Sequence, residues 1–590
     1  MLSKFIFALY LLFSLLILGV FCYIFFCDYD IFCDGILVIS QQQPFSDYFK
    51  TVLLTPARYQ LLQALGLGGA VSNLFLLLYF WAKIKRYVEK IAQFLLFIKY
   101  QLVQSFYFYK NTNRKNLLLF IWLFLALIIN NLYNIVYYEL QYDEAWTYNH
   151  FVSKGLFSCV FSPHNNHILY SILAHFCELF FAASKYSLRL PVFLGSLFLA
   201  WITGYFVGKK WGEKAAIISV SIFLFSPAVV FYSFFARGYI FVIIFATISL
   251  GSFWQIVIKG KTVDNLYYFA AFNLANILGF YSVATYFFAY LGINIIFFFW
   301  IIIANKKTYL YRLFLLSTWF KTNLKTLLIV FLLYFSQIVC NGMAILWTAS
   351  SETSEGYRLQ YVNKIWDWVF FGKDFTFIYI FAIFFLIIGA IIIIYNFYYK
   401  KNYLFSLLLA IIWVNFALIW IAPLPTPERT WVFLSIYSSL VFSYLFYLFY
   451  KKIIYNYTPF LGLFLLINSI IFAQIYNSQT HYHIYWSAKM DVEAKQIAAY
   501  IINKNHTEIY CFSRYDKPLL IAYYQQKTGK QLLIHMPFAD SKDYKPFADK
   551  KYSLVLLDTE NYKPTAIDYQ ILREKGYKLT QKVLRYEIYE

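Results

Sequence analysis

Long apolar runs, separated by short polar connections, dominate the pattern of hydrophobic and polar positions along the chain. A helix needs about 20 consecutive apolar residues to cross the hydrocarbon core of a bilayer. Thirteen such runs are present, at 5–26, 60–82, 116–138, 190–208, 215–235, 239–258, 266–283, 285–304, 326–347, 375–396, 403–422, 430–450 and 458–476. The pattern predicts an α-helical polytopic membrane protein with about 13 transmembrane helices.

Two more apolar runs, at 91–109 and 167–184, are ambiguous by length alone. Lys and Arg collect in cytoplasmic connections, so their positions indicate topology. If neither run spans and the N-terminus is cytoplasmic, every strong basic cluster is cytoplasmic, namely those at 83–90, 111–115, 209–214, 259–261, 305–325, 399–402 and 450–452. We therefore predict a cytoplasmic interfacial helix over 91–109. Over 167–184 we predict a juxtamembrane or re-entrant helix on the outer face, with its His residues and Glu178 toward water.

The pattern changes at about His481, where charged residues return and short apolar strands alternate with helical segments. EIYCF, QLLIHM and YSLVLL predict strands, and AKMDVEAKQIAAYIINK and YQILREKG predict helices, so we expect a small C-terminal α/β domain. No glycine-rich phosphate fingerprint follows its strands, and no nucleotide site is predicted. An odd number of spans places this domain outside the cytoplasm.

The predicted domain organisation has three parts. Residues 1–110 form a two-helix membrane extension with the interfacial helix, 111–480 form the transmembrane catalytic domain, and 481–590 form the soluble extracytoplasmic domain.

The composition agrees with a bilayer as the solvent. Of 590 residues, 61% are hydrophobic and only 13% are charged, which is too apolar for a soluble protein. The formal net charge of +21 lies in short basic connections, so it fixes orientation and does not indicate a nucleic-acid partner. High contents of Ile, Phe, Tyr, Lys and Asn are typical of an AT-rich bacterial genome, and we expect the bacterial inner membrane.

The densest polar cluster of the membrane region is QYDEAWTYNH (141–150), just beyond the third predicted span on the outer side. It contains two adjacent carboxylates, Asp143 and Glu144. A carboxylate near an acceptor hydroxyl can take its proton as a general base, and a low dielectric strengthens its interactions with nearby charges. The alternative is that the acidic pair only marks the membrane boundary.

Two more polar motifs adjoin the same face. SPHNNHILYS (162–171) brings Asn166 and His167 to the start of the predicted outer helix, where they can also act as ordinary capping residues. FFARGY (234–239) places Arg237 and Tyr239 between two spans. An arginine there either extends to lipid headgroups or binds a phosphate.

Two further arginines lie at outer ends of spans. PLPTPERTW (423–431) contains Arg429 after three prolines, which predict a shaped loop. Arg189, in SLRLP, begins a span, and we interpret it as an anchor of that helix rather than a substrate-binding residue. Together these motifs favour an anionic substrate with a lipid tail, such as a lipid-phosphate-linked group transferred outside the membrane.

The order of these motifs resembles a known family. YDEAWTY, NNHILYS, YSLRLP, SPAVVFYSFFARGY and GFYSVATY follow one another as in the family 39 membrane glycosyltransferases with the GT-C fold, which include protein mannosyltransferases and the aminoarabinose transferases of lipid A. The resemblance covers about residues 116–310 and continues more loosely, mainly through PERTW, to about 480.

The resemblance implies an inverting hexosyl- or pentosyltransferase that uses a polyprenyl-phosphate sugar on the extracytoplasmic side, without a cofactor or metal. It implies that Asp143 is the general base, with Glu144 beside it, that Arg237 lies near the lipid phosphate, and that His167 opens the outer helix. The acceptor is a glycan, a lipid or a protein, and membrane lipids surround the enzyme. The family's usual His after GFY is absent, since Ser282-Val283-Ala284 stands there, so its role has no carrier.

Other functions fit a polytopic chain as well. A transporter of lipid-linked sugars usually buries ionisable groups at mid-membrane and often contains repeated halves. Here the centres of the predicted spans are nearly free of charge, and no repeat is seen. A polysaccharide polymerase or ligase and a non-catalytic assembly protein are further alternatives. Convergence of Asp143, Arg237 and Arg429 on one outer cavity would favour the transferase.

Overall fold

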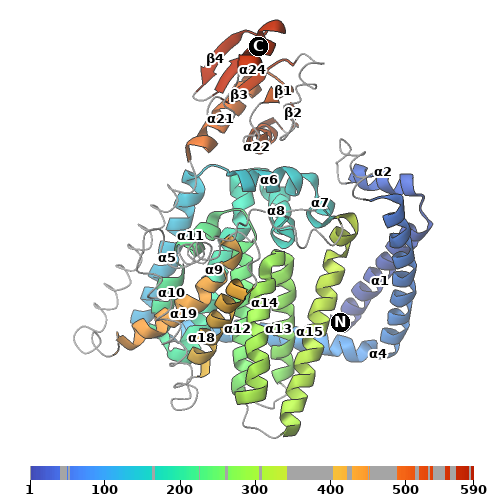
Figure 1. Ribbon diagram of the computed structural model, residues 1–590. Helices are drawn as coiled ribbons and strands as arrows, with labels where there is room; N and C mark the ends of the chain where they lie inside the picture. The colour runs from blue at the N-terminus through green and yellow to red at the C-terminus, as the bar shows by residue number, and fades with distance from the viewer. Residues whose placement is uncertain are drawn as a thin grey trace.

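A bundle of apolar helices carries a small α/β unit at one end (Figure 1). The computed structural model describes residues 2–39, 50, 54–161, 166–224, 226–259, 264–304, 309–341, 403–421, 428–449, 451, 488–511, 517–528, 530, 532–535, 552–558, 566–583 and 586–590.

The bundle is built almost entirely from α-helices. They are α1 (Leu2–Phe26), α2 (Tyr29–Ile39), α4 (Pro56–Lys110), α5 (Arg114–Tyr137), α6 (Tyr142–His150), α7 (Leu156–Phe161), α8 (Ile168–Phe181), α9 (Lys185–Trp211), α10 (Glu213–Leu224), α11 (Pro227–Phe234), α12 (Tyr239–Lys259), α13 (Asp264–Ser282), α14 (Phe287–Phe299), α15 (Tyr309–Asn341), α18 (Tyr403–Ile421) and α19 (Leu434–Phe449). The short turns η3 (Val152–Lys154), η4 (Ala284–Tyr286) and η9 (Glu428–Trp431) connect some of them.

Several described helices are long and apolar enough to cross a membrane. By length and composition they are α5, α9, α12, the stretch Ala284–Ile302 and α15, and the pair α10 and α11, bent by 74°, forms a sixth if it is one span. Predicted spans 375–396 and 458–476 lie outside the described residues, as does the end of the span 326–347 after residue 341. The described parts of the other predicted spans fall mainly on helices. The chain is thus a helical membrane protein, and the total of thirteen spans stays a prediction.

Helix α15 differs from its prediction. We expected a basic connection over 305–325, but the helix already begins at Tyr309 and includes Lys321 and Lys325. No Gly or Pro interrupts the sequence from there to Asn341, so nothing in the backbone stops the helix.

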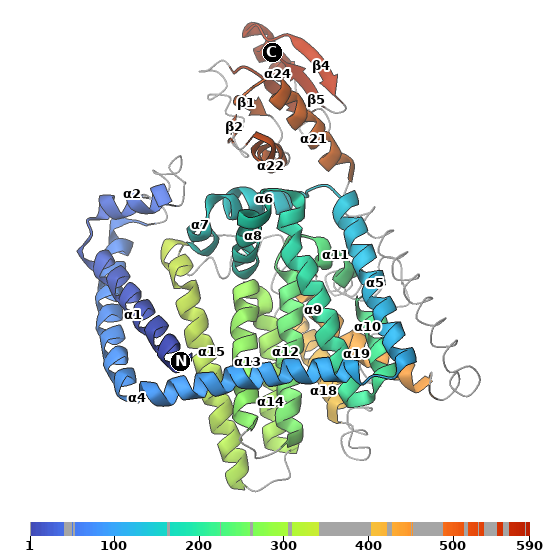
Figure 2. The ribbon, with the colours of Figure 1, turned by 180° about the vertical axis from the view of Figure 1, so that it is seen from behind.

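Helix α4 contains the predicted interfacial segment. Figure 2 shows one part of α4 beside α1 and the other part lying crosswise over α13, α12 and α9. The cytoplasmic, interfacial location of 91–109 stays a prediction. Two glycines of α9 permit this crossing, because a Cβ on Gly204 or Gly208 would collide with Tyr109 or Phe108 of α4. The small-xxx-small spacing is the usual solution for closely packed membrane helices.

Helix α8 is the predicted outer helix of 167–184. Its 14 residues span only about 21 Å, too short to cross a bilayer. The prediction that its polar residues face water is wrong. His175 Nδ1 lies 2.9 Å from the backbone oxygen of Val152, whereas Leu179, Phe180 and Phe181 form the exposed face. Apolar exposure is favourable where lipid replaces water as the solvent.

The C-terminal unit contains α21 (Ala488–Asn503), α22 (Lys517–Thr528), α24 (Ala566–Glu574) and the strands β1 (Glu508–Cys511), β2 (Leu533–His535), β3 (Val555–Asp558), β4 (Leu579–Val583) and β5 (Tyr586–Tyr589). The strand order is β2-β1-β3-β5-β4. β1 is parallel to β2 and β3, whereas β5 is antiparallel to β3 and β4. The predicted α/β class is confirmed, although the β4–β5 hairpin and α22 were not foreseen. The domain boundaries stay a prediction.

The C-terminal unit lies directly against helix α6. Helix α22 contacts α6, and Figure 1 shows the unit above α6 and α8 at one end of the bundle. The ammonium group of Lys495 on α21 lies 2.8 Å from the carboxylate of Glu139, just before α6.

Candidate functional site

In the first turn of α6, the side chain of one of its two carboxylate residues folds back toward the start of the helix. The Glu144 carboxylate accepts a hydrogen bond of 2.9 Å from the backbone N–H of Gln141, which precedes the helix. This is half of a capping box, in which the third helical residue satisfies an N–H that the helix leaves unpaired. Adjacent side chains on a helix diverge by about 100°, so Asp143 points elsewhere.

Glu144 also forms the centre of a buried ion pair. Arg189 of α9 donates to its two carboxylate oxygens, from Nε at 2.9 Å and from Nη2 at 2.6 Å. Both side chains are fully buried. The remaining N–H groups of Arg189 donate to the backbone oxygens of Ile135, Tyr138 and Glu139 at the end of α5.

This pair agrees with the interpretation of Arg189 as an anchor of its helix, and it identifies Glu144 as the partner. A buried charge is tolerated only when its hydrogen bonds are made, and removal of either partner would leave the other charge uncompensated. Since Arg189 joins α5, α6 and α9, it fixes the position of α6 relative to the other two helices.

The ARG tripeptide of the loop between α11 and α12 is fixed to the same hub. The N–H of Ala236 donates to Glu144 Oε1 at 2.8 Å, and the N–H of Gly238 donates to His167 Nδ1 at 2.7 Å. Arg237 therefore stands between two backbone groups that side chains from α6 and from the start of α8 hold in place.

Arg237 lies against α6, beside Asp143. Its Nη1 donates to the hydroxyl of Thr147 at 2.7 Å and faces the backbone oxygen of Asp143 at 3.5 Å. That hydroxyl in turn donates to the same Asp143 oxygen at 2.9 Å. Arg237 is fully buried and Asp143 is 8% exposed, so Arg237 does not extend to lipid headgroups. The structure thus brings the Arg237 guanidinium to the backbone of Asp143, in a place largely closed to solvent.

His167 and Tyr239 complete this corner. The His167 ring meets the Tyr239 ring edge to face at 4.8 Å. Because Nδ1 accepts the Gly238 N–H, the proton of the neutral imidazole is on Nε2. Only glycine fits at 238, since a Cβ there would lie 2.9 Å from the Ser282 backbone oxygen and 3.1 Å from His167.

The other predicted site residues have different surroundings. The Asn166 amide donates to the Cys159 oxygen of α7 at 2.6 Å and accepts from the Ser171 hydroxyl of α8 at 2.8 Å, so both its ends bond to the flanking helices. Arg429 belongs to η9 by its backbone, and its side chain lies outside the description. Where the family has a histidine, the Ser282 hydroxyl donates to the Leu278 oxygen and contributes no ionisable group.

Sequence reasoning did not place Glu178, a third carboxyl group, beside α6. Glu178 of α8 faces the hydroxyl of buried Tyr148. Burial raises the pKa of Glu178, against the opposing effects of His175 and Tyr148. The spacing of His175 and Glu178 on one short helix was visible, but not the side of the helix that packs inward. Among the described residues, no three His, Cys, Asp or Glu side chains are grouped so that they could hold a metal ion.

No protein-family model matches the chain, and no curated protein matches it. Among solved structures, ArnT from Cupriavidus metallidurans bound to undecaprenyl phosphate matches with a TM-score of 0.53 at 11% identity, over 80% of this chain and 97% of that chain. The chain has the GT-C fold. The archaeal oligosaccharyltransferase AglB from Archaeoglobus fulgidus, in complex with an inhibitory peptide and a dolichol-phosphate, also matches, with a TM-score of 0.47 at 13% identity, over 74% of this chain and 69% of that chain.

The GT-C fold confirms the architecture that the resemblance implied. Membership of family 39 and the roles of Asp143, Arg237 and His167 stay predictions. What the geometry adds is the division between the two carboxylates, because Glu144 is committed to Arg189 and to two backbone N–H groups.

Proposed function

We propose that the protein is a membrane glycosyltransferase that moves a sugar from a polyprenyl-phosphate donor to an acceptor hydroxyl. The observation that carries the proposal is the convergence of Asp143, on α6, with buried Arg237, on a loop held by Glu144 and His167. The GT-C fold, shared with a structure that contains undecaprenyl phosphate, supports this class of donor.

In the proposed reaction, the Asp143 carboxylate takes the proton of the acceptor hydroxyl. The acceptor oxygen then forms a bond to the anomeric carbon while the bond from that carbon to the phosphate oxygen breaks. Polyprenyl phosphate leaves with the electron pair, and a single displacement inverts the anomeric centre. A positioned base contributes about 10²–10⁴-fold to such a step.

Arg237 acts on the leaving phosphate in this proposal. Its guanidinium is held by Thr147 and by a loop fixed at both neighbouring N–H groups, so it is organised before the substrate arrives. A preorganised cation in a water-poor site stabilises developing negative charge without reorganisation. Glu144 and Arg189 act as positioning residues rather than catalytic ones.

The test uses purified full-length protein in detergent with undecaprenyl-phosphate-linked hexoses and pentoses, one at a time. Release of undecaprenyl phosphate and formation of glycosylated acceptor are followed by mass spectrometry. We expect release with at least one donor, and its loss in Asp143→Asn. Movement of intact donor across reconstituted vesicles without release would favour a transporter, and chain extension of a lipid-linked glycan would favour a polymerase.

We further propose that the end of the bundle bearing α6 and the C-terminal unit is extracytoplasmic. The basic connections of the sequence support this orientation. A C-terminal alkaline phosphatase fusion is then active and a C-terminal GFP fusion is dark. The reverse result would reject both the orientation and an outer location for Asp143.

A further inference from the structure

A second site-like feature lies at the other end of the bundle from α6. A partly open cavity of about 290 Å³ lies between the crosswise part of α4 and the helices α9, α12 and α13. Six of its lining residues, Phe94, Phe97, Ile98, Gln101, Leu102 and Ser105, come from α4. Their spacing of three and four puts them on one face of the helix, so α4 forms a wall.

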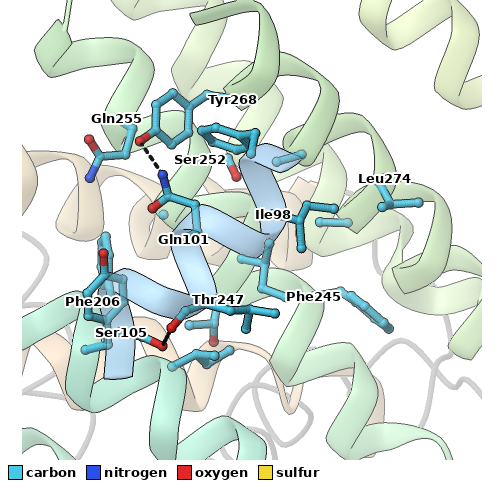
Figure 3. Close-up of a pocket in the computed structure, with 18 of the residues that line it drawn as sticks. Ile98, Gln101, Ser105, Phe206, Phe245, Thr247, Ser252, Gln255, Tyr268 and Leu274 are labelled. Atoms are coloured by element: carbon cyan, nitrogen blue, oxygen red, sulfur yellow. Dashed lines mark hydrogen bonds between the residues drawn. The ribbon is translucent and has the colours of Figure 1, made fainter. Parts of the chain in front are cut away.

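Hydrogen bonds on either side of the cavity fix this wall of α4 to the bundle. Gln101 donates from Nε2 to the Tyr268 hydroxyl of α13 at 3.4 Å, as Figure 3 shows. The Ser105 hydroxyl accepts from Trp201 Nε1 of α9 at 2.9 Å. Tyr109 then donates to the Trp201 backbone oxygen, where the glycines of α9 allow close packing. The cavity is thus a consequence of how α4 docks.

The walls select a hydrocarbon occupant. Most of the lining is apolar, from Phe198 and Phe245 to Leu274 and Leu278. A water molecule needs two to four polar partners. Polar residues are a minority of the lining, and Gln101, Ser105 and Thr247 among them already form hydrogen bonds to α13, to α9 and to the backbone of α12. An empty apolar cavity forfeits dispersion contacts with every atom of its lining. Inside a bilayer, an available group that restores them is an acyl chain.

The rim of the cavity adds a charge. Tyr205 of α9 lines it, and Lys209 donates to the Tyr205 hydroxyl at 3.2 Å. The next residue, Lys210, lies 4.5 Å from the centre of the Trp254 ring of α12. Both lysines are exposed in the last turn of α9. Ammonium groups beside an apolar crevice at a helix end are suited to an anionic lipid headgroup.

We propose that this cavity binds one acyl chain of an anionic glycerophospholipid, with the headgroup at Lys209 and Lys210. Residue 209 lies 24 residues along α9 from Lys185, which contacts Glu139 beside the candidate site. At 1.5 Å per residue the two ends are about 36 Å apart, so this lipid site is separate from the proposed transferase site and does not depend on it. It gives the N-terminal extension a role, since α4 forms one wall.

The test is native mass spectrometry of purified full-length protein with added phosphatidylglycerol or phosphatidylcholine. Gly251→Leu fills the cavity, where a Cβ meets only Phe206 at an ordinary 3.5 Å. Gly68→Leu, also on a helix but with open space around its Cβ, is the matched control. Loss of two buried methylenes corresponds to roughly tenfold, so we expect Gly251→Leu to weaken retention of both lipids at least about tenfold, and Gly68→Leu to leave it unchanged.

The charge is tested separately. Lys209→Gln with Lys210→Gln should remove the preference for phosphatidylglycerol, about fivefold per lysine, and Lys527→Gln with Lys530→Gln in the C-terminal unit should not.

Ala271→Phe is a second cavity-filling variant if Gly251→Leu does not fold. Equal retention in Gly251→Leu, Ala271→Phe and wild type would overturn the inference. Displacement of the phospholipid by stoichiometric undecaprenyl phosphate would also overturn it, because the cavity would then hold the donor chain.

Discussion

Two carboxylates five residues apart, Glu139 just before α6 and Glu144 in its first turn, differ sharply in burial. Glu144 and its partner Arg189 are fully buried, and every oxygen of the carboxylate is occupied. Glu139 is 17% exposed, and its partner Lys495 is 54% exposed. The inner pair fixes the site to the bundle, whereas the outer pair joins the C-terminal unit to it. Their difference in burial predicts a large difference in effect.

The largest expected effect is the loss of the inner pair. Arg189→Met leaves the Glu144 charge buried without its partner, which costs about 3–5 kcal/mol of stability. Thermal unfolding in detergent measures it. The double variant Glu144→Gln with Arg189→Met removes both charges and should be less destabilised than the sum of the single variants. Additive losses would mean that the two residues do not form a coupled pair.

The next effect separates chemistry from positioning. Asp143→Asn keeps the size of the side chain and removes its basicity, so transfer should fall by about 10² or more while the unfolding temperature stays constant. Glu144→Gln should instead lower both the activity and the unfolding temperature. Near-normal turnover in Asp143→Asn would reject the base, even if Glu144→Gln is inactive.

Hydropathy and charge bias alone predicted most of the helices, because an apolar run of sufficient length has one stable arrangement in a bilayer. The motifs singled out Asp143 and Arg237, whose roles stay predictions, and they indicated that Arg189 anchors its helix, but they did not identify its partner Glu144. A buried ion pair depends on which side chains meet across helices, and local sequence carries no such information. Two signals were available: the Gln-x-x-Glu spacing of a capping box at 141–144, and an arginine within an apolar run, which requires a partner.

The prediction of which face of α8 is exposed was wrong for a related reason. The expectation that His175 and Glu178 face water assumed an aqueous neighbour, but the exposed face carries Leu179 and three phenylalanines, Phe176, Phe180 and Phe181. Amphipathicity reverses its meaning where lipid is the outer solvent, so a periodic pattern fixes the face and not the direction of that face.

Arg237 allows a finer test of the inner region. Arg237→Lys keeps the charge but loses the planar fork, so the KM for the donor should rise about tenfold with kcat less affected. Thr147→Val keeps the arginine and removes the hydroxyl that accepts a hydrogen bond from its Nη1. We expect a smaller rise in the KM for the donor, about fivefold, from one lost hydrogen bond. Steady-state kinetics with varied donor measure both. An unchanged KM in Arg237→Lys would leave this arginine without a role in donor binding.

The smallest effect is expected at the outer pair. Lys495→Gln leaves Glu139 with Lys185, whose ammonium group lies 3.4 Å away, so the loss of stability should be about 0–1 kcal/mol.

Burial raises the pKa of Glu139, but the ammonium groups of Lys495 and Lys185 outweigh this effect and hold the pKa below its usual value. A lowered folded pKa means that the stabilisation is present above the unfolded pKa, near 4.5, and is lost as the pH falls through the folded value. Hydrogen exchange of α22, which packs on α6, should therefore accelerate at acid pH more in wild type than in Glu139→Gln. Identical pH profiles would show that Glu139 does not contribute to docking, and a loss as large as that of Arg189→Met would remove the distinction between the inner and the outer pair.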